Sequence, residues 1–387
     1  MNILKSITWG DVLKIGMIFG TRPEAIKMAP LYHHLIKRGV KAQVIATAQH
    51  RQMLDQVLSL FSIQADYDLN VMRHQQSLAG LTARLCDALD QIFQKESFDW
   101  ILTQGDTTST FVGSLMAFYH KIRIGHVEAG LRSFQRDDPF PEEINRRLTS
   151  QLATYHFAPT SQAKMNLIKD NICEDAITIT GNTVIDALMW IIREKKEELD
   201  RLVERYSVAG KKYILMTMHR RENHGIPMQN TMKAVKRLIR RFEEYYLVFP
   251  VHYNPAVREV VYRELEGEDR IILTEPVEYM DFIALMRDSR FIMSDSGGVQ
   301  EEAPSLGKPV LVLRKTTERP EAIESGVAKL IGTGTQSVYQ NASELIEDES
   351  LYHRMANASN PFGTGDACEK IADCLLNIQS QGKRNGC

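Results

Sequence analysis

The chain has 387 residues, of which 43% are hydrophobic and 25% charged, and its formal net charge at pH 7 is -2. This is the composition of a globular protein, and the length exceeds what one ordinary hydrophobic core accommodates, so two or three domains are expected. No basic excess favours nucleic acid or an anionic membrane as a partner. An acidic ligand would need positive charge that is concentrated locally.

Several other classes of protein are disfavoured by the absence of their motifs. No apolar run approaches the roughly 20 residues of a membrane span, and residues 1–13 lack the apolar core of a signal peptide. The five cysteines form no CxxC spacing, which predicts free thiols and a cytoplasmic protein. Neither a GxGxxG run, a P-loop nor an HExxH motif occurs, so no cofactor and no metal are expected; Mg²⁺ at Asp106 and Asp295 is the weaker alternative.

The first half of the chain alternates short apolar runs of β type with amphipathic helical stretches, which is typical of a parallel sheet covered by helices. Helical patterns cover residues 23–38, 77–93 and 109–120. The expected strands are 13–21, 42–48, 100–105, 122–127, 155–158 and 177–180.

The same pattern restarts after a charged stretch at 193–206, with strands expected at 213–218, 247–251, 270–273, 291–294, 309–313 and 328–331. Two sets of about six strands predict an α/β protein with two Rossmann-like doubly wound domains that face a central cleft. We place these domains at residues 1–187 and 188–366, and expect that the final helix, 367–380, can pack back on the first. Ligands of open parallel sheets bind beyond the carboxyl ends of the strands.

Two strand-to-helix turns carry the residues expected to bind phosphate. Gly20 permits a tight turn after the first strand, and Arg22 and Lys27 add positive charge near a helix N-terminus, which attracts anions. In the second half, a strand runs into a Ser-Gly-Gly turn whose backbone N–H groups could receive a diphosphate. The alternative for the first is an ordinary turn with a surface arginine, and the alternative for the second is an ordinary turn with a helix cap. The second turn and its surroundings contribute Ser296, Gly297, Gly298, Glu302, as a ribose acceptor, and Arg319.

Three carboxylates follow strands or begin a helix in the first half: Asp106, Glu128 and Glu142. Carboxylates that converge at one sheet edge raise each other's pKa, which suits acid–base work near neutral pH. Asp106 could instead cap the next helix, and Glu142 could simply favour a helix dipole. His219, which follows the first strand of the second half, could donate to a phosphate or transfer a proton.

Long segments of the chain together resemble the non-hydrolysing UDP-N-acetylglucosamine (UDP-GlcNAc) 2-epimerase family. The resemblance covers residues 13 to 380. The segments that carry it include GTRPEAIKMAPL (20–31), QGDTTSTF (104–111), GHVEAGLRS (125–133), PFPEEINRRLT (139–149), HRRENHG (219–225) and DSGGVQEEAPSLGKPVLVLRKTTERPEA (295–322).

The resemblance implies a glycosyltransferase-B-like fold, a homodimer, and interconversion of UDP-GlcNAc with UDP-N-acetylmannosamine (UDP-ManNAc) without nicotinamide or metal. It implies catalytic roles for Asp106, Glu128, Glu142 and His219. Many bacterial members bind a second UDP-GlcNAc as an activator, although Gln75 stands here where many of them carry arginine. The residues that match UDP contacts are Arg22, Lys27, Ser296, Gly297, Gly298, Glu302 and Arg319, and those that match activator contacts are Gln49, Gln52, Gln76, Glu142, Arg220 and His252.

The family chemistry predicts elimination of UDP to 2-acetamidoglucal followed by re-addition. Three other functions remain open at the level of sequence. A glycosyltransferase would move the sugar to an acceptor, a hydrolysing epimerase would release free sugar, and a catalytically silent sensor would only bind the UDP-sugar.

Overall fold

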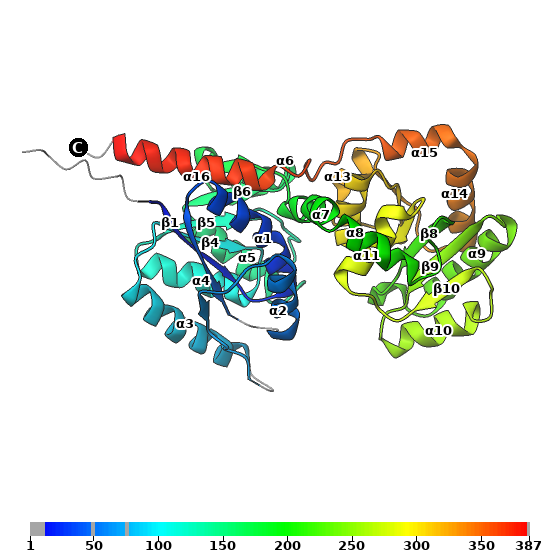
Figure 1. Ribbon diagram of the computed structural model, residues 1–387, viewed down its shortest axis with the longest axis horizontal. Helices are drawn as coiled ribbons and strands as arrows, with labels where there is room; N and C mark the ends of the chain where they lie inside the picture. Colours follow the sequence, from blue (N-terminus) through cyan, green and yellow to red (C-terminus); the bar gives the residue numbers. More distant parts are fainter. Residues whose placement is uncertain (1–11, 48–50, 74–76, 385–387) are drawn as a thin grey trace, which may run out of the picture. The chain divides into compact units, whose positions relative to one another are not determined.

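A computed structural model describes residues 12–47, 51–73 and 77–384 (Figure 1). The chain forms two compact units. The first unit ends at Ala187 and resumes at Gly365, and the second is Leu188–Thr364. Helix α7 (Thr183–Glu194) contains the first of the two crossings between them.

The first unit is built on a parallel sheet of seven described strands in the order β3-β2-β1-β4-β5-β6-β7. The strands are β1 (Lys14–Phe19), β2 (Lys41–Ala46), β3 (Tyr67–Asp68), β4 (Trp100–Gln104), β5 (Arg123–Val127), β6 (Tyr155–Ala158) and β7 (Ile177–Ile179). The helices are α1 (Arg22–Lys37), α2 (Arg51–Leu60), α3 (Leu78–Lys95), α4 (Thr108–Tyr119), α5 (Glu142–Leu152), α6 (Ser161–Lys169) and α16 (Ala367–Arg384).

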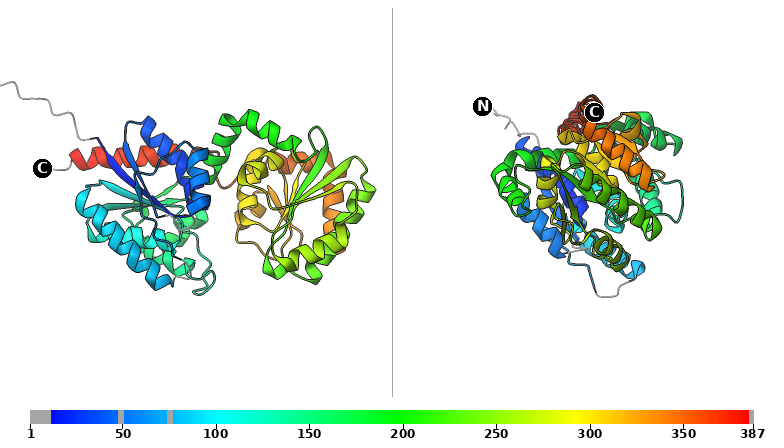
Figure 2. Two further views of the ribbon diagram at one scale, coloured as in Figure 1. Left: turned by 60° about the horizontal axis from the view of Figure 1, so that its bottom comes forward. Right: turned by 90° about the vertical axis from the view of Figure 1, so that its right-hand side faces the viewer.

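The apolar strands of this sheet are buried because helices cover both of its faces, as Figure 2 shows. Helix α1 packs with α2 and α16, whereas α3, α4 and α5 pack side by side. The core strand β4 (WILTQ) is buried at every residue. Gly125 on β5 is required by close packing, since a Cβ there would lie 2.6 Å from the Leu102 side chain.

The second unit repeats the arrangement with six described parallel strands in the order β10-β9-β8-β11-β12-β13. The strands are β8 (Lys212–Thr217), β9 (Tyr245–Pro250), β10 (Ile271–Thr274), β11 (Ile292–Ser294), β12 (Val310–Val312) and β13 (Ala328–Leu330). The helices are α8 (Lys196–Glu204), α9 (Ile226–Arg241), α10 (Pro255–Leu265), α11 (Tyr279–Asp288), α12 (Gly297–Glu302), α13 (Pro320–Glu324), α14 (Thr335–Glu347) and α15 (Glu349–Ala356).

Each strand order contains one switch point, where consecutive connections run in opposite directions along the sheet. It lies between β1 and β4 in the first unit and between β8 and β11 in the second. Loops diverge at such a point, and ligands of doubly wound folds bind there. The residues that follow these four strands therefore occupy the expected binding edge of each sheet.

The predicted fold class, two Rossmann-like parallel sheets with interleaved helices, is confirmed. The two-residue strand β3 was missed, because its polar sequence has no apolar pattern and its pairing with β2 defines it. Helix α16 packs against α1, where Arg38 Nη2 donates to Asp373 at 2.5 Å. No helix in the described part of the chain has both the length and the apolar character needed to cross a lipid bilayer.

Candidate active site

The turn after β1 is organised by a buried carboxylate, Glu24, near the start of α1. Its Oε2 accepts the backbone N–H groups of Gly20 and Thr21 at 2.9 and 2.7 Å. Its Oε1 accepts the hydroxyls of Thr107 and Thr110, from the neighbouring β4–α4 connection, at 2.5 and 3.0 Å. Glu24 therefore ties the Gly20–Arg22 turn to the residues that follow β4.

The turn after β4 presents Asp106. Gly105 makes this turn with φ +75°, a conformation that glycine adopts without strain. The Asp106 carbonyl accepts Asn145 Nδ2 at 3.0 Å, and its carboxylate accepts Arg146 Nη2 at 2.6 Å, both from α5. The alternative that Asp106 caps the following helix is wrong, because the hydroxyl of Thr107 caps α4 by accepting from Thr110 N–H at 3.2 Å.

Glu128 follows β5, the next strand, and adopts φ +63°, which is uncommon for a residue with a side chain. Such strain clusters at functional sites, where the surrounding structure enforces it. The Glu128 carboxylate pairs with the Lys27 ammonium group, and the two side chains are only 9% and 17% exposed. Lys27 therefore neutralises a carboxylate at this sheet edge.

Two of the predicted carboxylates of the first unit, Glu128 and Glu142, act on the third, Asp106. Burial raises the pKa of Asp106 above its usual value; the Glu128 and Glu142 carboxylates raise this pKa further, whereas the Arg146 and Lys27 cations lower it. Glu142 is the first residue of α5, so a favourable interaction with that helix N-terminus is compatible with this arrangement. A carboxyl group whose pKa is raised keeps its proton to a higher pH than a free carboxyl group, which suits a group that gives and takes protons.

A second buried carboxylate, Asp295, organises the equivalent turn in the second unit. It follows β11 and is fully buried. Its oxygens accept the backbone N–H groups of His219 and Arg220, after β8, at 3.0 and 2.8 Å, and Nδ2 of Asn223 at 2.9 Å. Its Oδ1 also lies 3.3 Å from Nδ1 of His219. Asp295 thus holds both the backbone and the imidazole ring of His219.

Cationic groups surround the Gly297–Gly298 turn at the start of α12. A Cβ on Gly297 would lie 3.7 Å from the Arg319 guanidinium and 3.9 Å from that of Arg220. Arg319 is oriented by its pair with Glu301, and Arg220 by Glu318 at 3.2 Å. The N–H groups of a first helical turn have no intrahelical acceptor, and together with these cations they can bind a diphosphate.

The remaining predicted side chains of this unit lie around the same turn. A Cβ on Gly298 would lie 3.6 Å from Glu302 Oε1 and 3.9 Å from the Ser296 hydroxyl. Tyr279 donates to Glu302 Oε2 at 3.1 Å, which orients that carboxylate for hydrogen bonding to a diol. The exposed His252 ring stacks on His219, with ring centroids 5.7 Å apart.

Some predicted residues are not placed, and some organising residues were not predicted. Gln49 and Gln76, and Gln75 with them, lie outside the described residues, as does the side chain of Gln52. Sequence reasoning did not single out Glu24 or Arg146. The Thr21-x-x-Glu24 spacing of a capping box was the available signal for Glu24. Among the described residues, no group of three or more histidine, cysteine, aspartate or glutamate side chains is arranged to hold a metal ion.

Two doubly wound α/β units, each with polar residues gathered at its switch point, define a glycosyltransferase-B-like protein. Residues 34–376 match the family described as UDP-N-acetylglucosamine 2-epimerase. The chain belongs to this family.

Individual relatives cover nearly the whole chain. The UDP-N-acetylglucosamine 2-epimerase of Bacillus subtilis is 52% identical over 94% of this chain and 95% of its own length. The crystal structure of the Neisseria meningitidis UDP-GlcNAc 2-epimerase bound to UDP-GlcNAc has a TM-score of 0.82 and 48% identity, over 94% of this chain and all of that one. The S. aureus MnaA–UDP co-structure has a TM-score of 0.82 and 48% identity, over 95% of this chain and 97% of that one.

The pairing of Arg146 with Asp106 predicts how the pKa of this carboxyl responds to substitution. Arg146→Met removes the strongest influence that lowers this pKa, so the pKa should rise further and Asp106 should take up its proton at higher pH than in the wild type. NMR titration of ¹³C-labelled carboxyl groups would follow it. The control is Arg147→Met, because Arg147 pairs with Glu143 at 2.9 Å. An Asp106 pKa that falls, or that responds equally to both substitutions, would contradict this assignment.

Proposed function

We propose that this protein interconverts UDP-GlcNAc and UDP-ManNAc by inverting the configuration at C2 of the sugar. The gathering of Asp106, Glu128 and Glu142 at one sheet edge carries the proposal, since epimerisation requires groups that remove and return a proton. Membership of the family and the UDP-GlcNAc-bound structure of the Neisseria meningitidis relative support the substrate.

The chemistry that best explains these groups is elimination followed by re-addition. No carbonyl adjoins C2, so its proton is not acidic enough for direct removal. When a carboxylate takes the C2 proton, the C–H electron pair forms a C1–C2 double bond and the C1–oxygen bond to UDP breaks, which leaves 2-acetamidoglucal and UDP. The oxygen of UDP then adds back to C1, and a carboxyl group delivers a proton to C2 from the opposite face.

Elimination makes different demands on the two units. In the first unit, we assign proton transfer to Asp106 and Glu142, with Glu128 stabilising charge or relaying protons. In the second unit, the negative charge that develops on the departing diphosphate requires preorganised donors. The Gly297–Gly298 turn, Arg319 and His219 are the groups proposed for this role, and Arg22 and Lys27 are proposed to add positive charge from the first unit.

The surroundings of His219 fix the orientation of its ring, and its Nε2 can donate to a phosphate oxygen when the ring carries a proton on both nitrogens. Burial lowers the pKa of this imidazole, and although Asp295 raises it, His252 and Arg220 lower it further. Contact with the Asp295 carboxylate favours a proton on Nδ1. The ring is therefore held in orientation by Asp295 and stacked on His252, which suits a group that must meet a phosphate oxygen in one geometry.

Replacing Glu128 tests the assignment of the carboxylates. Glu128→Gln retains the shape of the side chain and a hydrogen-bond acceptor for Lys27, but cannot exchange a proton or balance positive charge. Epimerisation should fall by about 100-fold or more, the scale of a lost acid–base group, while UDP binding measured by calorimetry stays near the wild-type value. Normal turnover in this variant would remove Glu128 from the chemistry.

A single assay on the wild type separates epimerisation from the other functions. The enzyme is incubated with UDP-GlcNAc alone in D₂O, and the sugar is followed by proton NMR. An epimerase of the proposed type produces UDP-ManNAc with deuterium at C2. Accumulating free N-acetylmannosamine and UDP would indicate hydrolysis, UDP release that depends on an added acceptor would indicate a transferase, and unchanged substrate would indicate a binding protein.

We further propose that a second UDP-GlcNAc activates the enzyme through a site that includes Arg220 and His252. Both residues adjoin the proposed donor groups: the Arg220 guanidinium lies near Gly297, and His252 stacks on His219. A ligand that contacts them could thus change the geometry of the diphosphate site. We propose that the same activator site includes Glu142, Gln49, Gln52 and Gln76.

An activator that is also the substrate leaves a kinetic signature. The rate should depend sigmoidally on UDP-GlcNAc concentration. A reaction started from UDP-ManNAc alone should begin slowly and accelerate as UDP-GlcNAc forms, and a trace of added UDP-GlcNAc should abolish the lag. A hyperbolic curve together with immediate turnover of UDP-ManNAc would contradict the second site.

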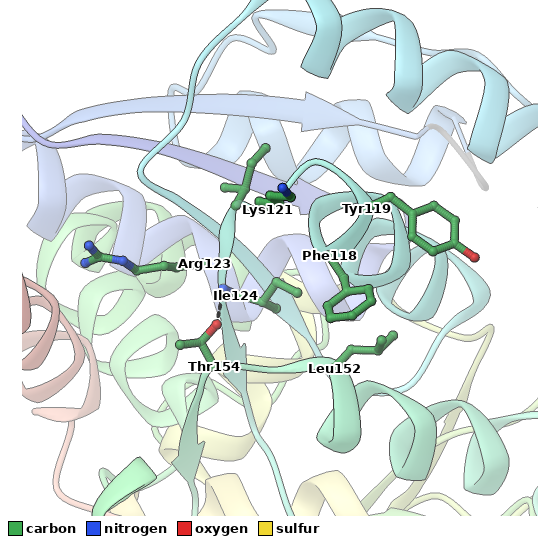
Figure 3. A pocket seen from close by; sticks show the side chains of 8 residues that line it. Phe118, Tyr119, Lys121, Arg123, Ile124, Leu152 and Thr154 are labelled. Carbon is green, nitrogen blue, oxygen red and sulfur yellow. Dashed lines mark hydrogen bonds between the residues drawn. The ribbon is translucent and has the colours of Figure 1, made fainter.

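We also propose that the protein is a homodimer and that the C-terminal end of α4 lies in the interface. Phe118 and Tyr119 are 56% and 64% exposed, and a pocket of about 520 Å³ lies beside them. Figure 3 shows Phe118, Ile124 and Leu152 gathered at this pocket. Exposed apolar patches of this kind mark interaction sites, and a second copy of the chain is the partner that we propose.

Sedimentation velocity tests this interface. Phe118→Asp should raise the dimer dissociation constant at least about tenfold, because losing a buried aromatic anchor costs about 2 kcal/mol or more. The matched control is Met165→Asp, which places the same charge at another exposed apolar side chain of the first unit. A monomeric wild type, or equal dissociation in the two variants, would refute the proposed interface.

A further inference from the structure

His126 is a buried histidine to which the proposed elimination and re-addition assigns no role. It lies on β5, two residues before Glu128, and is 1% exposed. Its Nε2 lies 2.7 Å from the carbonyl oxygen of Gly105. A carbonyl can only accept, so Nε2 carries the proton, and Nδ1 is the bare nitrogen, which makes no hydrogen bond to any residue that the structure describes.

The acceptor of this bond belongs to the turn that presents Asp106. Three consecutive carbonyls of the turn are each held by a side chain from a different element. The Thr110 hydroxyl of α4, whose one proton also faces Glu24, donates to Gln104 at 2.6 Å. His126 of β5 donates to Gly105, and Asn145 of α5 donates to Asp106 at 3.0 Å. The Gly105 N–H, in turn, donates to the Val127 carbonyl at 3.1 Å. His126 and Val127 thus bind both polar groups of Gly105.

A role in packing alone does not account for a histidine at this position. Its neighbours in β5, Gly125 and Val127, carry no polar side chain, and burying a ring nitrogen without a partner is unfavourable. Burial lowers the pKa of His126 to about 3, so the imidazole is neutral at any pH at which the carboxylates work. The side chain therefore acts through its hydrogen bond, and neither carries charge nor transfers protons.

We propose that His126 is a positioning residue that sets Asp106 at a defined place relative to Glu128. The strand that carries the histidine also carries Glu128, and the side chain of the histidine holds the turn that carries Asp106. One residue therefore links the backbones of two carboxylates that must address the same sugar ring. This inference rests on the proposed epimerase function, because it assigns His126 a role in that reaction.

Two substitutions and a matched control test the proposal. His126→Phe keeps a ring of similar volume and removes the donor. His126→Gln keeps an N–H near the position of Nε2. The control is His156→Phe: His156 is also 1% exposed, is paired with His126 in the register of β5 and β6, and has its Nε2 2.9 Å from the Ser150 carbonyl, away from the Asp106 turn.

The measurements are kcat and KM for UDP-GlcNAc, UDP affinity, and the midpoint of thermal unfolding. His126→Phe should lower kcat at least about tenfold with KM and UDP affinity within about twofold, since small misplacements of a reacting group cost up to about 100-fold. His126→Gln should recover most of that loss. His156→Phe should leave kcat within about twofold even where its unfolding midpoint falls as far as that of His126→Phe.

Two results would overturn the proposal: a kcat for His126→Phe that matches the control, or a loss that tracks the unfolding midpoint in all three variants and is not relieved by glutamine. Failure of the proposed function is a separate observation. It would be seen in the wild type, as absence of UDP-ManNAc with deuterium at C2, before any variant is compared.

Discussion

In each sheet, consecutive connections change direction between two neighbouring strands. In both units, a buried carboxylate forms hydrogen bonds that join the segments following those two strands. Glu24 accepts backbone N–H groups from the turn after β1 and hydroxyls from the connection after β4. Asp295 follows β11 and accepts backbone N–H groups from the turn after β8. A buried ionised group is tolerated only where donors surround it, so each carboxylate requires its turns to keep one geometry. Several of the residues that the proposed function uses, Asp106, His219 and Gly297–Gly298, are carried on these turns.

The two units differ in the sign of the charge that these turns present. In the first unit, carboxylates predominate at the sheet edge, and each of Asp106 and Glu128 has a cation beside it. Burial nevertheless outweighs Arg146 and raises the pKa of Asp106. In the second unit, guanidinium groups face the Gly297–Gly298 turn and are oriented by Glu301 and Glu318. The proposed proton transfer and the proposed binding of an anionic leaving group thus have separate structural supports.

Sequence reasoning located strands and site residues well where a local pattern exists. The strand β6 has the predicted limits, and other strands end within a few residues of their predicted positions, because alternation of apolar runs with turn residues is a local property. The choice of helix cap was wrong at Asp106, since Asp106 and Thr107 are both good capping residues and only the backbone geometry decides between them. A capping-box spacing points to Glu24, but no local pattern points to its bonds with Thr107 and Thr110 or to the bond from His126 to Gly105, because these join residues far apart along the chain.

The sequence by itself determined the class of the fold, the family, and the residue types at the ends of the strands, because apolar periodicity and long motifs are properties of consecutive residues. Only the tertiary structure decided which of these residues interact. Strand order brings the turns after β1, β4 and β5 to one edge, and it is there that Lys27 meets Glu128, Arg146 meets Asp106, and His126 reaches Gly105. Hydrogen bonds and ion pairs act over a few ångströms, and these residues, 21 to 101 positions apart, come within that range only when the sheet has formed.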